Sequence, residues 1–263
     1  MEFFNLIFLD PVLNILIVIT NFLGGNFGLA IIALTLIVRL AILPLTMRQL
    51  RASKKMTDSM RELQPKIQQI QKKYAKDKQK LFKEQQKLFK EAGVNPMGCL
   101  TSPMLVTMII QMPIFIALYR AIIQAVAVTP QDFLGLSDHL YSWSIVHETL
   151  PVSGEFLWLH LGSPDPYFLI PILVTATMWV SQKMMTSPSG SNQQQQSMQG
   201  MMQIMMPLMF GFITFTLPSG LGLYFLVTSV ISIVTQYRIY GWSNLKFSNP
   251  FNRLQPKQLP EKK

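Results

Sequence analysis

An apolar run from Phe27 to Leu45 carries one charge, Arg39, in its interior. Its 19 residues are enough to cross the hydrocarbon core of a membrane as a single helix. A guanidinium keeps its proton, so Arg39 is costly at bilayer depth unless it reaches water or a partner. The run therefore predicts a membrane-spanning helix, and Arg39 is the first candidate for a functional residue.

The composition extends this prediction to the whole chain. Of 263 residues, 49% are hydrophobic and 14% are charged, a balance that is closer to a multi-spanning membrane protein than to a soluble domain. We expect an all-α membrane protein with five transmembrane helices. Their predicted ranges are 26–46, 103–128, 167–185, 203–218 and 220–241.

The first 25 residues differ from a cleaved signal peptide, because they contain Glu2 and Asp10 but no Lys or Arg. The apolar piece from Val12 to Leu23 is too short to span a membrane. We expect residues 1–25 to be an external N-terminus with an interfacial helix. Cys99 is the only cysteine, which leaves no intrachain disulfide and argues against a lipid-modified N-terminus.

Positive charge is concentrated in one predicted loop. Residues 47–102 contain 14 Lys and Arg against five Asp and Glu, whereas residues 121–182 contain no Lys or Arg. Because positive loops stay in the cytoplasm, we expect residues 47–102 to lie there. Alternation then places the loop 129–166 outside, and the loop 186–202 and the basic tail 242–263 inside.

The basic loop carries a helical pattern. Apolar residues recur at spacings of three and four: Met60, Leu63, Ile67, Ile70 and Tyr74. A second helix is predicted from Lys80 to Ala92, where the pair Leu-Phe repeats after seven residues. We therefore expect a cytoplasmic antiparallel helical hairpin within residues 47–102. Its Lys-rich surface is either a solvated face near anionic lipid or a docking surface for a ribosome or a targeting factor.

The loop 186–202 is rich in Gln, Ser and Met, and we expect it to be flexible. Eight methionines fall between Met184 and Met209. Two readings stay open for them. They form an adaptable surface for varied apolar partners, or they fill contacts between helices and lipid.

Enzyme chemistry is not expected, because the five predicted spans contain no Asp, Glu or His. The histidines His139, His147 and His160 lie in the outer loop at irregular spacing, which does not match a metal site. We expect no cofactor and no metal. A small-solute transporter or channel remains the alternative, although such proteins usually carry intramembrane carboxylates and repeated halves.

Arg39 has two explanations at this point. It lies about 13 Å along the helix from Arg48, so a tilted helix or a thinned membrane would let it reach the cytoplasmic surface. The other explanation is a polar cavity in the membrane that opens to the cytoplasm. Thr35 lies on the same helical face, and the candidates on other spans to line such a cavity are Gln111, Gln182 and Gln236.

Five stretches of the chain match one known family in the order in which the family has them. They are GLAIIALTLIVRLAILPLT at Gly28, LQPKIQQIQKKY at Leu63, NPMGCLTSPMLVTMIIQMPIFIALYRAI at Asn95, DPYFLIPIL at Asp165 and LPSGLGLYFLVTS at Leu217. On these stretches the chain resembles the YidC insertase family over nearly its whole length. It lacks the large outer domain that the longer members have before the first span.

The resemblance implies a membrane protein insertase and chaperone of the bacterial plasma membrane, with five helices around a hydrophilic groove open to the cytoplasm. Arg39 matches the groove arginine, and Thr35 matches the polar face beside it. Tyr224 and Phe225 match aromatic positions on the last span near the substrate path, and Gln182 matches a polar position on the third span. The implied partners are nascent membrane proteins, the ribosome, targeting factors, lipids and the Sec translocon, without specific nucleic-acid binding.

Overall fold

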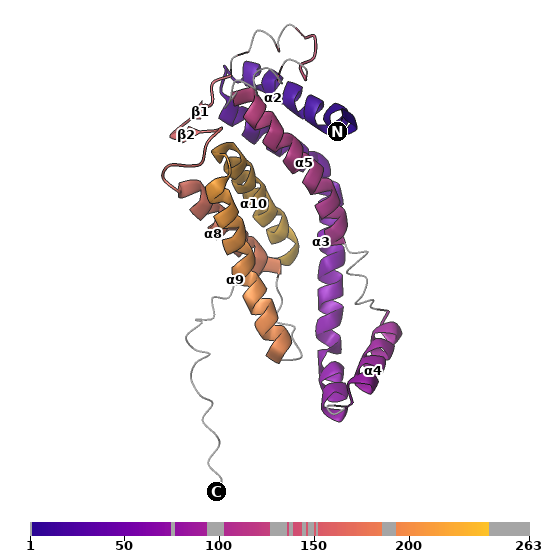
Figure 1. Cartoon of the computed structure of the whole chain (residues 1–263). Coiled ribbons are helices and arrows are strands. Elements are labelled where there is room, and N and C mark those ends of the chain that lie inside the picture. The colour runs from indigo at the N-terminus through magenta and orange to yellow at the C-terminus, as the bar shows by residue number, and fades with distance from the viewer. Residues whose placement is uncertain are drawn as a thin grey trace.

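The protein is mostly helical, and the computed structural model describes residues 2–74, 77–93, 103–126, 136, 139–143, 146, 150, 152–185 and 193–241 (Figure 1). The helices are α1 (Glu2–Phe4), the π-helical η1 (Asn5–Leu9), α2 (Asp10–Phe22), α3 (Phe27–Lys73), α4 (Lys78–Glu91), α5 (Pro103–Val126), α8 (Leu169–Met185), α9 (Gln193–Thr216) and α10 (Ser219–Tyr240). Two short strands, β1 (Glu155–Phe156) and β2 (Leu159–His160), pair antiparallel.

The helices form a bundle around α10, which packs against both α8 and α3. Figure 1 shows α8, α9 and α10 grouped on one side, with α5 along the upper half of α3. Helices α3, α8 and α10 begin, and α5 and α9 end, at the end of the bundle that carries β1 and β2. We call this the strand end, and the opposite end, beside α4, the α4 end.

Helix α3 runs for 47 residues, so the predicted first span and the first arm of the predicted hairpin are one continuous helix. Asn26 caps its start, where the side-chain oxygen accepts a hydrogen bond from the Leu29 backbone N–H at 3.0 Å. Pro44 and Pro65 both lie inside this helix. The predicted boundary at residue 46 is therefore not a break in the helix.

Helix α4 packs against the far end of α3 and completes the helical hairpin. On α3, Leu63 and Ile67 are buried, as the three-and-four spacing requires. The α4 helix begins after Asp77, whose carboxylate accepts a hydrogen bond from the Lys80 backbone N–H at 3.1 Å. This charged cap explains where the second arm starts.

The segment before α8 is more ordered than the simple loop expected for residues 129–166. It carries the two strands, and its backbone bonds to the start of α10: the Ser219 N–H donates to the Ser163 carbonyl at 2.7 Å, and the Ser219 hydroxyl donates to the His160 carbonyl at 2.7 Å. Gly220 lets the chains approach, because a Cβ there would lie 3.1 Å from the Leu161 carbonyl oxygen. The strand segment thus covers the first turn of α10.

The N-terminal helix is joined to the same end of the bundle. Figure 1 shows α2 lying across the strand end of α3 and α5, and it contacts both helices. Asn14 is fully buried, and its amide donates to the His139 carbonyl at 2.8 Å while its oxygen accepts from the Tyr141 N–H at 2.8 Å. Asp10 also pairs with the His139 ring nitrogen at 2.8 Å. These bonds hold the helix against the segment after α5.

Three helices in the described part of the chain are long and apolar enough to cross a membrane: Asn5–Phe22, Phe27–Lys73 and Ser219–Tyr240. The apolar stretches Gln111–Val126, Leu169–Met185 and Gln203–Thr216 are shorter. The N-terminal helix is longer than the sequence indicated, because it continues through Asp10 and Pro11, and the Asp10 carboxylate finds a partner in His139. Its interfacial position stays a prediction.

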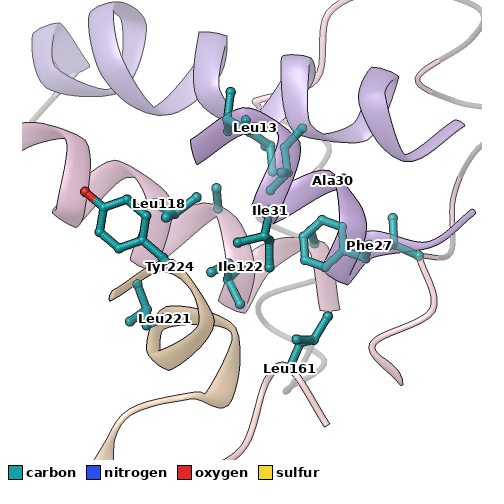
Figure 2. Close-up of a cluster of buried hydrophobic side chains, with 14 of the residues drawn as sticks. Leu13, Phe27, Ala30, Ile31, Leu118, Ile122, Leu161, Leu221 and Tyr224 are labelled. Atoms are coloured by element: carbon teal, nitrogen blue, oxygen red, sulfur yellow. The ribbon is translucent and has the colours of Figure 1, made fainter. Parts of the chain in front are cut away.

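The apolar core lies at the strand end (Figure 2). The side chains labelled in the figure come from α2, α3, α5, α10 and the strand segment, and they are Leu13, Phe27, Ala30, Ile31, Leu118, Ile122, Leu161, Leu221 and Tyr224. Residues of η1 and α8 also belong to the core. Phe27, Ile31, Ile122 and Leu221 are completely shielded from solvent. We call this core the seal, because it joins α2, α3, α5 and α10 at one end of the bundle.

Candidate functional site

Arg39 lies just beyond the seal, where the surroundings of α3 change. From Phe27 to Thr35 most of the helix is buried, whereas none of residues 36–49 is buried. We call residues 36–49 of α3 the open stretch. Leu50, the next residue, is buried, and its carbonyl accepts a hydrogen bond from the Tyr240 hydroxyl on α10 at 3.4 Å. Arg39 thus lies on a partly exposed part of α3 between two buried regions.

The Arg39 guanidinium reaches across to two other helices. Its Nη2 donates to Gln111 Oε1 on α5 at 3.1 Å, and Gln111 Nε2 donates to the Tyr224 hydroxyl on α10. The chain Arg39, Gln111 and Tyr224 therefore links α3, α5 and α10, and we call it the polar cluster. All three residues were site candidates from the sequence, although it could not show that they join.

Tyr224 belongs both to the seal and to the polar cluster. Its side chain is 3% exposed and packs with the apolar core. In Figure 2 its ring lies beside Leu118, and its hydroxyl points away from the other labelled side chains. A tyrosine suits this position because it has an apolar ring and a polar tip. The position of the seal therefore fixes where the Tyr224 hydroxyl, and with it Gln111, is held.

The charge of Arg39 has no carboxylate beside it in the part of the chain that the structure describes. The ion pairs of Lys80 with Asp77 and of His139 with Asp10 lie in other parts of the molecule. The bond to Gln111 uses one N–H of a group that has five, and the Arg39 side chain is partly exposed. The site can therefore accept an anionic or strongly polar group from outside the protein.

Thr35 lies one turn from Arg39 toward the strand end, and it is 2% exposed. Its hydroxyl donates to the Ile31 carbonyl at 2.6 Å, the local bond that threonine often makes inside a helix. The structure thus places Thr35 at the buried edge of the site, with its proton already used. A hydroxyl facing a cavity was the expectation from the sequence.

Phe225 lies in an aromatic group next to the polar cluster. Its ring centroid lies 5.5 Å from that of Phe115 on α5, 6.1 Å from Phe210 on α9 and 5.6 Å from Tyr224. Sequence reasoning found Phe225 but missed Phe115 and Phe210. Phe115 is four residues after Gln111 and so on the same face of α5, which was the available signal.

Gln182 lies between a different pair of helices. Its side-chain nitrogen is 3.9 Å from the Met206 sulfur, so it bridges α8 and α9. Nearby on α8, the Ser181 hydroxyl donates to Gln236 Oε1 on α10 at 3.0 Å.

The described residues include no group of three or more His, Cys, Asp or Glu that could hold a metal ion.

The family model described as 60Kd inner membrane protein matches residues 18–246. The chain belongs to this family. The description of the 60Kd inner membrane protein family, together with the apolar helices, indicates an inner membrane protein.

Curated relatives of the 60Kd inner membrane protein family carry insertase names. The membrane protein insertase YidC of Vibrio cholerae is 37% identical over 232 residues, which are 88% of this chain and 36% of the relative. The membrane protein insertase MisCA of Bacillus subtilis is 34% identical, over 88% of this chain and 77% of the relative. The membrane protein insertase YidC of Oceanobacillus iheyensis is 38% identical, over 87% of this chain and 80% of the relative.

These relatives confirm the resemblance to the YidC insertase family that the five sequence stretches indicated. The coverage differs between them. The chain spans about a third of the length of the Vibrio relatives it matches, at 36%. It spans most of the length of the Bacillus and Oceanobacillus relatives.

Proposed function

We propose that this protein is a membrane protein insertase that receives nascent membrane proteins at Arg39 and releases their apolar helices into lipid. The observation that carries the proposal is the polar cluster, in which a permanent charge without a described carboxylate partner is held by Gln111 and Tyr224. Two relatives with insertase names support it: they are 34% and 38% identical to this chain, and the matches cover most of their own length.

The seal and the open stretch suggest the shape of the site. Helices that converge at the strand end and leave residues 36–49 of α3 uncovered would form a hydrophilic groove that is closed at the strand end. The positive charge of residues 47–102 and of the basic tail 242–263 supports a cytoplasmic α4 end, so the groove would open to the cytoplasm and to lipid. Five spans would surround it.

In this groove Arg39 would hold a polar or acidic segment of the incoming chain partway across the membrane. An ion pair there would be stronger than in bulk water, because the surrounding protein and lipid lower the effective dielectric constant. The seal would stop water and ions from following. The apolar helix of the substrate then moves sideways into lipid, which is favourable without a nucleotide or a metal.

The helical hairpin of α3 and α4 would recruit the substrate. Its exposed lysines, among them Lys83 and Lys87 on α4, suit contact with a ribosome or a targeting factor, and cooperation with the Sec translocon is part of the proposal. Deletion of residues 63–92 should reduce recruitment while insertion of a pre-delivered substrate continues. Loss of the folded bundle in this deletion would show that the hairpin is a structural brace instead.

The central test is complementation in cells depleted of their own insertase. Arg39→Ala should lower insertion of a single-span substrate with external Asp or Glu by about tenfold, the value of a charge-assisted hydrogen bond. Arg39→Lys should keep most of the activity. Arg48→Ala removes an exposed arginine at the far end of the open stretch, and it should lower insertion by less than about twofold, because it lies about 13 Å along the helix from Arg39. Full insertion of the acidic substrate by Arg39→Ala would overturn the proposal.

A further inference from the structure

A second polar site lies between α3 and the C-terminal end of α10, separate from the polar cluster. It is a pocket of about 510 Å³. Its basic residues are Arg51, Lys54 and Lys55 from α3 and Arg238 from α10. Arg51, Lys55 and Arg238 are exposed, so their charges are available to a ligand from outside.

Two hydrogen bonds hold the walls of this pocket together. Lys54 Nζ donates to the Ile239 carbonyl at 2.7 Å, and the Tyr240 hydroxyl donates to the Leu50 carbonyl at 3.4 Å. The lysine thus satisfies a carbonyl in the last turn of α10, where helix carbonyls lack internal partners. Because the walls are fixed, the pocket exists before any ligand binds.

The pocket lies at the depth of lipid headgroups. Along the helix axes, Arg51 is about 36 Å from Phe27, and Arg238 is about 28 Å from Ser219, at 1.5 Å per residue. The hydrocarbon core is about 30 Å thick, so with the strand end at one surface the pocket reaches the other. Met47 and Ile239 supply apolar lining, as a site next to acyl chains requires.

Charge is ordered along the wall that α3 provides. The cations Arg51, Lys54 and Lys55 come first, and the carboxylates of Asp58 and Glu62 follow about 6 and 12 Å farther from the membrane than Lys54. A ligand that suits this order carries a phosphate close to the membrane and hydrogen-bond donors beyond it. The excess of positive charge favours a ligand with a net negative charge.

We propose that this pocket binds the headgroup of an anionic phospholipid of the phosphatidylglycerol class. The phosphodiester contacts Arg51, Lys55 and Arg238, and the glycerol hydroxyls donate to Asp58 and Glu62. The bound lipid fills the junction of α3 and α10. It thereby stabilises the contacts of Leu50 with Tyr240 and of Lys54 with Ile239. This inference rests on membrane location and not on insertase activity.

The test measures lipid binding to the purified full chain in detergent by native mass spectrometry, with phosphatidylglycerol, phosphatidylethanolamine and phosphatidylcholine as probes. The double variant Arg51→Gln/Arg238→Gln should lower the affinity for phosphatidylglycerol by about tenfold or more. The double variant Arg48→Gln/Lys87→Gln makes the same change in charge outside the pocket and should lower it by less than about twofold.

Other outcomes overturn the proposal. Equal losses in both double variants would mean general attraction to the basic surface, and equal binding of the three lipids would mean no headgroup recognition. Competition by a short RNA at low concentration, with no lipid preference, would assign the pocket to nucleic acid. If the first double variant melts at a lower temperature than the unchanged protein, Lys55→Gln, at an exposed residue, provides the same comparison with a smaller expected loss.

Discussion

Helix α3 contains two regions that are both apolar in sequence but differ in structure. From Phe27 to Thr35 it is packed into the seal, with Phe27, Ala30 and Ile31 fully shielded. In the open stretch that follows, Leu36, Ile37 and Leu40 are 42%, 55% and 63% exposed. Hydrophobicity alone therefore does not say which part of a membrane helix meets protein and which part meets lipid or a substrate.

The difference follows from the residues that face each region. Small residues permit close packing at the strand end: a Cβ at Gly28 would collide with the ring of Phe156, and one at Gly220 would approach Ile122 at 3.3 Å. Beyond Thr35, Arg39 carries a charge whose burial in the apolar seal would be costly. Packing stabilises the first region, and the second region carries Arg39, on which the proposed function depends.

The largest predicted effect is a difference in stability between two variants of α3, one that truncates a buried side chain and one that truncates an exposed side chain. Phe27→Ala should destabilise the protein by about 3 kcal/mol, because it leaves a cavity in the seal. Leu40→Ala should change the stability by less than about 0.5 kcal/mol. Unfolding in detergent, followed by circular dichroism, measures both. Equal losses would mean that the open stretch is packed against protein after all.

Asp165 tests whether the strand segment is part of the seal. Its carboxylate is 3% exposed and accepts hydrogen bonds from the Ile170 N–H at 2.7 Å, the Tyr167 N–H at 3.1 Å and Trp158 Nε1 at 3.3 Å. Asp165→Ala removes these bonds at the start of α8 and should cost about 2 kcal/mol.

Two measurements check the Asp165 prediction. Asp165→Ala should lower the unfolding temperature and shift the fluorescence of Trp158, which loses its acceptor. Asp165→Asn keeps one acceptor oxygen and should give a smaller loss. If neither variant changes the stability, the strand segment is not needed to close the strand end.

The Tyr224 side chain takes part in both the seal and the polar cluster: its ring packs in the seal, and its hydroxyl belongs to the polar cluster. Tyr224→Phe keeps the ring in the seal and removes the hydroxyl that accepts from Gln111. We expect a loss of stability of only about 1 kcal/mol. Because Gln111 then loses the group that positions it, insertion of acidic substrates should fall several-fold.

The unfolding and complementation assays described above measure the two effects of Tyr224→Phe separately. Phe115→Leu is the control, since it alters the neighbouring aromatic group and leaves the polar cluster intact. A parallel loss of stability and insertion in Tyr224→Phe would mean that the polar cluster only supports the fold.

Much of this arrangement was predictable from the sequence. The apolar runs located α5, α8, α10 and the end of α9, and the Leu63 and Ile67 spacing located the helical hairpin, because each depends on local periodicity. The start of α9 was wrong: the helix begins at Gln193, ten residues before the predicted start and inside the loop 186–202 that was expected to be flexible. Arg39 stood out because a fixed charge in an apolar run has few explanations. These signals lie within one helix and need no knowledge of the neighbouring helices.

The contacts between helices were not predictable. The bond from Arg39 to Gln111 and the position of Tyr224 at the edge of the seal depend on how α3, α5 and α10 are rotated, which a single sequence does not record. The burial of Thr35 was missed for the same reason. Asn14 also escaped notice, since its partners lie more than 100 positions away in the chain.

The smallest predicted effect concerns pH, and it distinguishes the hairpin from the seal. The hydrogen bond from the Lys80 backbone N–H lowers the pKa of the Asp77 carboxyl, with a further contribution from the Lys80 ammonium at 3.4 Å. A carboxylate whose pKa is lowered on folding stabilises the folded state above its ordinary pKa. That contribution is lost as the pH falls through the lowered value, so the first turn of α4 should loosen below about pH 4.

Amide exchange of residues 78–80 between pH 2 and pH 6, compared with the intrinsic rate at each pH, measures this change. Protection of the seal amides of Phe27, Ala30 and Ile31, compared at each pH between the unchanged protein and Asp77→Asn, should be the same, because Asp77 lies in the hairpin and not in the seal. Asp77→Asn keeps an acceptor at the cap and cannot ionise, so it should remove the pH dependence. If α4 loosens to the same extent in Asp77→Asn, another group titrates, and the hairpin depends on charge beyond its cap.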